Sequence, residues 1–158
     1  MASPTIEFRN ALTPFAVITS LALTGTGPGG AIPLGSSSSV ATVRVYNNFA
    51  SVGSIADALA CTLSCYDDAT HQGQATTTPV TNLYLYVEVN DYNGGTTGQD
   101  VAFFAIGGLT KHAVPTNSGT ISGTGTNYIT VNIKAVVPVN NSIPSITQGL
   151  WLEYSSSS

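Results

Sequence analysis

The sequence predicts an all-β protein, built as a two-sheet antiparallel sandwich of seven or eight strands with at most one short helix. Short runs of β-branched and aromatic residues recur along the chain, separated by Gly, Pro, Asn and Ser at intervals of about 8 to 15 residues. Long stretches with helical periodicity are absent. An immunoglobulin-like sandwich and a jelly roll both fit this pattern, and the sequence leaves the choice between them open.

The predicted strands share this composition and are, in chain order, residues 15–23, 40–46, 83–89, 101–106, 119–123, 128–137 and 150–154. The run 83–89 is the clearest, because apolar residues occupy every second position and Tyr84, Tyr86 and Glu88 lie between them. Such alternation is typical of a strand with one face in the core and the other in water.

Residues 40–46 alternate in a similar way. Val43 and Val45 fall on one side of the predicted strand, and Arg44 and Tyr46 fall on the other.

One segment, Ser54–Ala60, could form a short helix, with Ser54 as the N-cap and Asp57 at the capping-box position. The glycine- and serine-rich segment 25–39 is too long for an ordinary turn. We expect this loop to contact a neighbouring subunit or to be mobile.

The chain divides into an N-terminal arm at residues 1–13, a β-sandwich domain at 14–154 and a polar tail at 155–158. The arm alternates apolar and polar residues around Ile6 and Phe8, so it could add a strand to the open sheet edge of a neighbouring molecule. The alternative is an edge strand within its own domain.

Cys61 and Cys65 are the only cysteines. On an extended strand their backbones would lie about 13 Å apart, which is beyond the reach of a disulfide. A bridge therefore needs a segment that is not extended, and we expect two buried free thiols.

Charged residues make up only 8% of the chain, against about 25% in typical soluble domains. Such a surface suits permanent contact with another protein, because hydroxyl and amide groups are less costly to desolvate than ions. The net charge is −4, and the four basic residues are scattered singly, which disfavours nucleic-acid binding. No apolar run approaches the length of about 20 residues that a membrane span requires, and we find no intact signal peptide.

The sequence predicts that the protein is not an enzyme. His71 and His112 are the only histidines, neither lies in a catalytic motif, and no catalytic residue is assigned. No cofactor is expected except a possible Ca²⁺, with Asp91, Asn93 and Asp100 as candidate oxygen ligands. The alternative for that loop is a plain hairpin turn at Asn-Gly-Gly.

Aromatic side chains are the other candidate site residues. We expect Tyr84, Tyr86 and Trp151, together with Ile6 and Phe8, to form an interface with other subunits, where aromatic residues are enriched. The alternative is a sugar-binding platform, because a tyrosine ring can stack on a pyranose while its hydroxyl stays hydrated.

Three short stretches, residues 43–49 (Val-Arg-Val-Tyr-Asn-Asn-Phe), 55–59 (Ile-Ala-Asp-Ala-Leu) and 66–67 (Tyr-Asp), resemble segments of β-sandwich structural proteins of tailed bacteriophages and related viruses. The resemblance implies a virion component, such as a capsid-decoration, tail or fibre-associated protein. It carries over no catalytic or ligand-binding residue.

The functional expectation is a structural subunit of a larger particle, in a virion, with copies of itself and other structural proteins as partners. The first alternative is an extracellular filament subunit that assembles by strand exchange. The second is a carbohydrate-binding or adhesive module at a cell surface, with a glycan as its partner.

Overall fold

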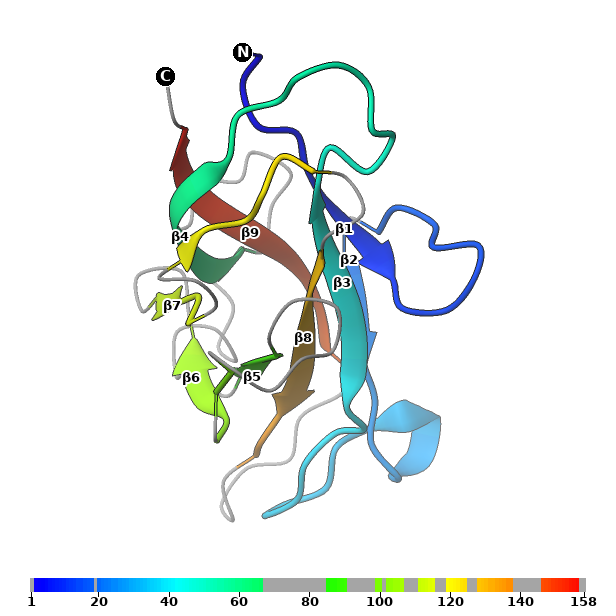
Figure 1. Cartoon of the computed structure of the whole chain (residues 1–158). Helices are drawn as coiled ribbons and strands as arrows, with labels where there is room; N and C mark the ends of the chain where they lie inside the picture. Colours follow the sequence, from blue (N-terminus) through cyan, green and yellow to red (C-terminus); the bar gives the residue numbers. More distant parts are fainter. Residues whose placement is uncertain are drawn as a thin grey trace.

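The computed structural model describes residues 2–18, 20–66, 85–90, 99–100, 102–106, 111–115, 119–124, 128–137 and 146–156. Within these ranges the chain forms two antiparallel sheets that face each other (Figure 1). The predicted all-β, two-sheet sandwich is therefore confirmed.

One sheet has five strands in the order β1-β3-β8-β5-β6, and the other has four in the order β2-β9-β4-β7. The bounds are β1 Ile6–Asn10, β2 Ser20–Leu23, β3 Ala41–Asn47, β4 Ala58–Tyr66, β5 Leu85–Asn90, β6 Phe104–Ile106, β7 His112–Ala113, β8 Tyr128–Ala135 and β9 Ile146–Ser156. A single turn of 3₁₀ helix, η1 (Pro28–Gly30), lies between β2 and β3.

The strand pairs are nested. β2 pairs with β9, β3 with β8, β4 with β7 and β5 with β6, all antiparallel. Of these eight strands, β2 to β9, the first pairs with the last, the second with the last but one, and so on to the two in the middle. The strands thus form one long hairpin that is folded over into two sheets. This is the jelly-roll arrangement, so the structure selects one of the two topologies that the sequence leaves open.

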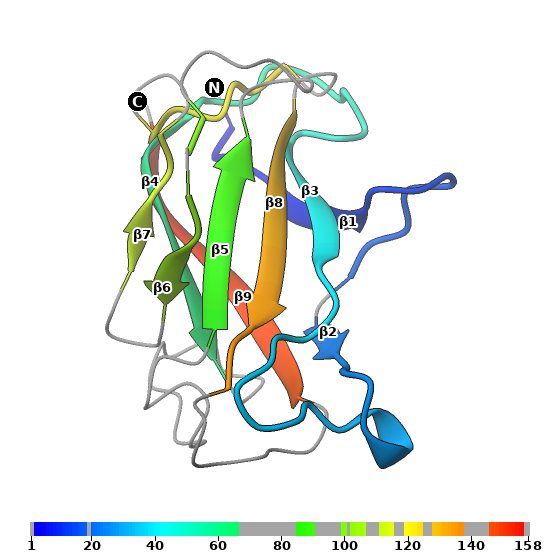
Figure 2. The ribbon, with the colours of Figure 1, turned by 90° about the horizontal axis from the view of Figure 1, so that it is seen from below.

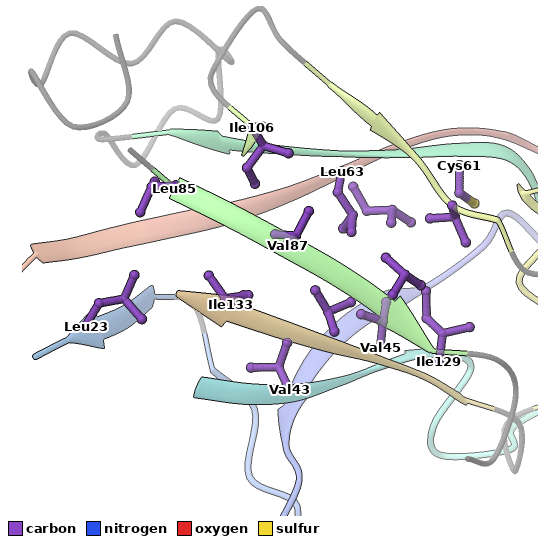
Figure 3. Packing of buried hydrophobic residues seen from close by; sticks show 14 of the residues in the cluster. Leu23, Val43, Val45, Cys61, Leu63, Leu85, Val87, Ile106, Ile129 and Ile133 are labelled. Atoms are coloured by element: carbon purple, nitrogen blue, oxygen red, sulfur yellow. The ribbon is translucent and has the colours of Figure 1, made fainter. Parts of the chain in front are cut away.

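The core lies between the sheets, and its side chains come from alternate positions of the strands. Val43 and Val45 on β3 and Val87 on β5 point towards Leu63 and Cys61 on β4 (Figure 3). All five are at most 2% exposed. The alternation predicted for residues 40–46 and 83–89 places these β3 and β5 valines in the core.

Several predicted strands change length. Of residues 15–23 only Ser20–Leu23 forms β2, because the residues before it turn back and bond to β1, with the Ile18 amide donating to the Phe8 carbonyl at 2.8 Å. Residues 119–123 form no strand and contribute an isolated bridge at Ile121. β6 is shorter than the predicted 101–106, whereas β9 is longer than the predicted 150–154.

The predicted helix at Ser54–Ala60 is wrong. Residues from Ala58 onward belong to β4, and Ile55 makes an isolated bridge with Ala2. Asp57 does not cap a helix, because its carboxylate accepts a hydrogen bond from the Gly123 amide at 2.8 Å. Partners distant in the sequence therefore override a weak local helix signal.

The ends of the chain belong to the sandwich. β1, in the predicted arm at residues 1–13, pairs along its whole length with β3 of the same chain, which is the alternative stated for that segment. The polar tail predicted at 155–158 is wrong for its first two residues, because Ser155 and Ser156 pair with the start of β4. The termini meet at one end of the molecule (Figure 1), where the Tyr154 hydroxyl donates to the Pro4 carbonyl at 3.3 Å.

The loop 25–39 is anchored on its own domain. Ile32 is fully buried, and the Ser38 amide donates to the Ala135 carbonyl at 2.8 Å. The predicted contact of this loop with a neighbouring subunit stays a prediction.

Both cysteines lie on the extended strand β4. Cys61 is a buried free thiol, as predicted. The side chain of Cys65 lies outside the described residues.

Candidate functional site

The side of the five-stranded sheet that faces away from the core carries a concentrated set of charged and aromatic residues. Strand register places Arg9 opposite Arg44 and Tyr46 opposite Tyr128. Because alternate positions on a strand share one face, this surface is the counterpart of the buried valines. We call it the outer face, formed by Glu7, Arg9, Thr42, Arg44, Tyr46, Tyr86, Glu88, Tyr128, Asn132 and Lys134, of which Tyr46 is itself buried under its neighbours and only 4% exposed.

Two arginines of the outer face lie over aromatic rings. The guanidinium carbon of Arg9 is 3.6 Å from the ring centroid of Phe49, and that of Arg44 is 4.0 Å from the ring centroid of Tyr128. Both distances are within the range of about 6 Å for cation–π attraction. Tyr46 lies between these contacts, with its ring centroid 4.8 Å from Phe49 and 5.3 Å from Tyr128. The five side chains form one stacked cluster.

The same arginines hold the loop that joins β1 to β2. Arg9 donates to the Phe15 carbonyl at 2.9 Å and makes an ion pair with Glu7 at 2.7 Å. Arg44 lies 4.8 Å from the centroid of the Phe15 ring. The Arg9 side chain is only 16% exposed, so both its charge and its position are constrained by neighbouring groups.

Residues 11–17 of this loop project from the side of the sandwich (Figures 1 and 2). Leu12 is 75% exposed and Val17 is 51% exposed. The loop has internal hydrogen bonds, since the Leu12 amide donates to the Asn10 side chain at 3.0 Å and the Phe15 amide donates to the Leu12 carbonyl at 2.9 Å. An ordered apolar projection thus adjoins the stacked cluster.

The outer face continues across β8 and β5 with polar contacts. The Lys134 ammonium is 4.2 Å from the Phe103 ring centroid. The Asn132 side chain accepts a hydrogen bond from Thr42 at 2.8 Å and donates one to Glu88 at 3.3 Å. These cross-strand bonds tie β3, β8 and β5 together on the side away from the core.

Charge is distributed unevenly between the outer face and the rest of the chain. The outer face holds three of the four basic residues and two of the eight acidic ones, which gives 3 − 2 = +1. The rest of the sequence holds one basic and six acidic residues, which gives 1 − 6 = −5, and the two parts sum to the net charge of −4.

The predicted interface residues fall in different places. Ile6 and Phe8 are partly buried and pack against the core of their own domain. Tyr86 lies on the outer face and is half-buried. Trp151 lies on β9 opposite Ser64, but its side chain is outside the described residues, as is the whole of Tyr84.

Two of the three predicted Ca²⁺ ligands, Asp91 and Asn93, lie outside the described residues. Asp100 is described, and its Oδ2 atom lies 2.6 Å from Nε2 of His112 and accepts a hydrogen bond from the Val89 amide at 2.9 Å. Among the described residues there is no group of three or more side chains arranged to bind a metal.

The Asp100–His112 pair connects the two sheets. Asp100 is bonded to the backbone of β5 in the five-stranded sheet, and His112 is on β7 in the four-stranded sheet. The His112 ring also stacks on Phe104, with centroids 4.5 Å apart. The contacts of Asp100 are thus those of a structural carboxylate.

Sequence reasoning missed the stacking partners Phe15 and Phe49. Phe15 falls in the predicted strand 15–23 but lies in the loop before β2, and Phe49 lies in a loop whose path the strand pattern does not define. It placed Arg44 and Tyr46 correctly on the side opposite Val43, since alternation along one strand is enough to assign a face. Arg9 could have been found in the same way, from the alternation of the segment around Ile6.

Comparison with known proteins gave no match to a protein-family model, a curated protein or a solved structure. In the part of the chain that the structure describes, no helix has the length and apolar character needed to cross a membrane.

Proposed function

We propose that this chain is a structural subunit that assembles with copies of itself through the outer face, as part of a virion. The observation that carries the proposal is the stacked cluster of Arg9, Arg44, Tyr46, Phe49 and Tyr128. The proposed role is structural and involves no catalysis.

The residue types of the stacked cluster, and the contacts that already hold them in place, support a role as a protein interface. Arginine and aromatic residues are enriched in the centres of interfaces, where they account for much of the binding energy. Here Arg9 is already constrained by Phe49, Glu7 and the Phe15 carbonyl. Little side-chain entropy would therefore be lost when a partner covers the surface.

Charge supports a second copy of this chain as the partner. The outer face has a net charge of +1, and the rest of the chain has −5. The outer face of one copy would therefore be attracted to the remaining part of the next copy, which is negative in net charge. A contact between two different surfaces repeats from copy to copy and closes into rings or continues into filaments, as a particle subunit requires.

The strand order supports a virion as the setting. Jelly rolls recur in viral capsid proteins, and the sequence segments 43–49 and 55–59 resemble those of phage structural proteins. The first point is an analogy at the level of the fold, because jelly rolls also occur in lectins and other proteins.

Strand exchange at β1, the mechanism expected for a filament subunit, has less support. The outward backbone groups of Phe8 and Asn10 already bond to Ile18 and Ala16, at 2.8 Å in each case. An incoming strand would have to displace these bonds before it could pair with β1.

Light scattering and negative-stain imaging of the full chain test the proposal. We expect particles or oligomers in the wild type, weakened at high salt because part of the attraction is electrostatic. Arg44→Ala should reduce assembly at least tenfold in apparent affinity, and Arg44→Lys should reduce it too, because lysine keeps the charge but loses the planar stacking.

Lys111→Ala is the matched control, since it removes one positive charge away from the outer face. It should assemble at least as well as the wild type. Thermal melting must show that all variants fold. Equal assembly of the Arg44→Ala and Lys111→Ala proteins, or a wild type that stays monomeric at high concentration, would overturn the proposal.

A further inference from the structure

A second surface lies at the end of the sandwich where the termini meet. The connection from β3 to β4, residues 48–57, and the segment 121–124 run side by side there (Figures 1 and 2). Between them is an open cleft of about 420 Å³. This volume lies within the range of about 300 to 1,000 Å³ that is typical of small-molecule sites, and it is far larger than a single ion needs.

One wall of the cleft is fixed by hydrogen bonds to Gly123. The Asn48 side chain donates to the Gly123 carbonyl at 3.0 Å, and the Asp57 carboxylate accepts from the Gly123 amide at 2.8 Å. The backbone of Gly123 also lies so close to Ile55 that a Cβ atom would be only 2.1 Å from the Ile55 carbonyl oxygen. Two side chains and one close backbone contact therefore fix the position of this wall.

The opposite wall is a tight turn. Asn48 has a φ of 65° and Ser51 a φ of 54°, both in the left-handed region. The Asn48 side chain accepts a hydrogen bond from the Val52 amide at 3.0 Å, and the Ser51 amide donates to the Asn48 carbonyl at 2.8 Å. Asn48 thus holds both walls, and the cleft is formed before any ligand arrives.

The lining is polar and carries no positive charge. Hydroxyl groups come from Ser51, Ser54 and Thr124, and a carboxylate comes from Asp57, whose Oδ1 atom already bonds to Gly123. Hydroxyl groups donate and accept hydrogen bonds, whereas a carboxylate only accepts. A ligand with several hydroxyl groups, which both donate and accept, would complement this lining.

Charge narrows the class of ligand. Anionic ligands would be repelled by Asp57, because the described residues of the lining include no lysine, arginine or histidine. A bound Ca²⁺ usually takes six to eight oxygen ligands and more than one carboxylate, whereas Asp57 is the only acidic side chain among the described residues that line the cleft. A neutral molecule that is rich in hydroxyl groups satisfies both constraints.

We propose that this cleft binds a neutral saccharide, with sugar hydroxyls donating to Asp57 and exchanging hydrogen bonds with Ser51, Ser54 and Thr124. This site differs from the tyrosine platform that the sequence suggests, because the lining contains no tyrosine. Its formation does not depend on the proposed assembly.

A single site of this kind binds weakly. Ile55 is the one large apolar side chain in the lining, and there is no aromatic ring on which a sugar could stack. A dissociation constant in the millimolar range is expected, on the order of 1 to 10 mM. If the proposed assembly holds, many copies on one particle would raise the effective affinity by avidity for a surface that displays many sugars.

Saturation-transfer difference NMR on the full chain tests the site, because it detects weak ligands on monomers and large assemblies alike. The probes are the methyl glycosides of glucose, galactose, mannose and N-acetylglucosamine, each titrated to 50 mM. We expect saturation transfer to at least one of them. Asp57→Asn should weaken it at least tenfold while keeping an oxygen that can accept the Gly123 hydrogen bond.

Glu88→Gln is the matched control, since it makes the same change of charge on the outer face, and it should bind as the wild type does. Ser54→Trp, which places a bulky side chain at the cleft, should abolish binding without a charge change. No transfer to any of the four glycosides, or transfer in the Asp57→Asn and Ser54→Trp proteins equal to that in the wild type, overturns the proposal. Neither outcome bears on assembly, which Arg44→Ala tests separately.

Discussion

The outer face and the Gly123 cleft are both polar surfaces, but the chain builds them in different ways. On the outer face, residues such as Arg9 and Arg44 are placed by regular strand pairing, and their contacts are largely with one another. At the cleft, Asn48 and Asp57 hold a segment that lies 75 and 66 positions away in the sequence. One surface follows from a repeating pattern, and the other depends on a few individual bonds.

This difference has consequences for stability. A side chain on a regular strand face can be replaced while the backbone ladder and the apolar face beneath it remain. A side chain that satisfies buried backbone groups in a loop has no such substitute, and its loss leaves those groups without partners. We therefore expect the cleft end of the molecule to be much more sensitive to single substitutions than the outer face.

Of the substitutions compared, Gly123→Ala should lower the free energy of unfolding the most. Its Cβ atom would lie 2.1 Å from the Ile55 carbonyl oxygen, and relief of this overlap must move backbone, at a cost of about 3 kcal/mol or more. Chemical denaturation measures the loss. Gly53→Ala is the matched control at the same cleft, since its φ is 68° but its Cβ would meet nothing within 4 Å, so we expect a loss of only about 1 kcal/mol. Equal losses would contradict the close contact at Gly123.

Asn47→Ala tests whether the stability of the protein depends more on side chains at the loop end than on those of the outer face. Asn47 is fully buried, and its side chain bonds to the Thr5 amide and to the Ala56 and Ile121 carbonyls, at 2.9 to 3.1 Å. Loss of these bonds removes the Asn47 partner of the Thr5 amide and the Ala56 carbonyl, while the Ile121 carbonyl keeps its bond from the Ala58 amide at 2.9 Å. The free energy of unfolding should fall by about 3 kcal/mol.

The comparison for Asn47→Ala is Arg44→Ala, three positions earlier on the same strand. Arg44→Ala removes the contacts of the guanidinium with the Tyr128 and Phe15 rings and its long hydrogen bond to the Tyr46 hydroxyl at 3.3 Å, so we expect about 1 kcal/mol in the same denaturation experiment. A larger loss at Arg44 than at Asn47 would remove the proposed difference between the two regions.

Substitution of two buried serines should change the free energy of unfolding by smaller amounts and in opposite directions. The Ser38 hydroxyl donates to the Ser39 carbonyl and accepts from the Ala135 amide, so Ser38→Ala should cost about 1 to 2 kcal/mol. The Ser64 hydroxyl on β4 has no hydrogen-bond partner among the described residues. Ser64→Ala should therefore be neutral or raise stability by up to about 1 kcal/mol. Thermal melting of the two variants side by side distinguishes the signs.

The last expected effect is confined to alkaline pH and is due to Cys61. Burial raises the pKa of this thiol from 9.0 to about 11. Because the folded state holds the proton more tightly, the contribution to stability is complete below pH 9 and is lost as the pH rises from 9 to about 11. The difference in unfolding free energy between wild type and Cys61→Ala should therefore shrink over this range, and a difference that stays constant would contradict the raised pKa.

The two regions also differ in how far the sequence predicts them. Alternation in residues 40–46 and 83–89 assigned the core valines and the outward positions of Arg44 and Tyr86, because the period of two is a local property of a strand. The helix predicted at Ser54–Ala60 failed because Asp57 bonds to Gly123 and not to its own segment. No pattern near Asp57 records that distant partner.

The end of β9 is a second place where a distant partner decides the structure and the local sequence does not predict it. Residues 155–156 look like a polar tail because they contain only serine, yet pairing with β4 makes them the end of β9. The pairing is decided by backbone groups, which are the same for every residue type except proline. Side-chain composition therefore carries little information about where such a strand ends.

The sequence by itself predicted the fold class and the core-facing positions of its clearest strands, and it contains few charged residues. Only the tertiary structure decided the jelly-roll order, the gathering of three cations on one face and the cleft around Gly123. The physical reason is the separation in sequence between the residues on which each feature depends. The alternation of apolar and polar residues can be recognised in neighbouring residues. Strand order and loop contacts depend on groups as far apart as Asn48 and Gly123, which meet only when the chain has folded.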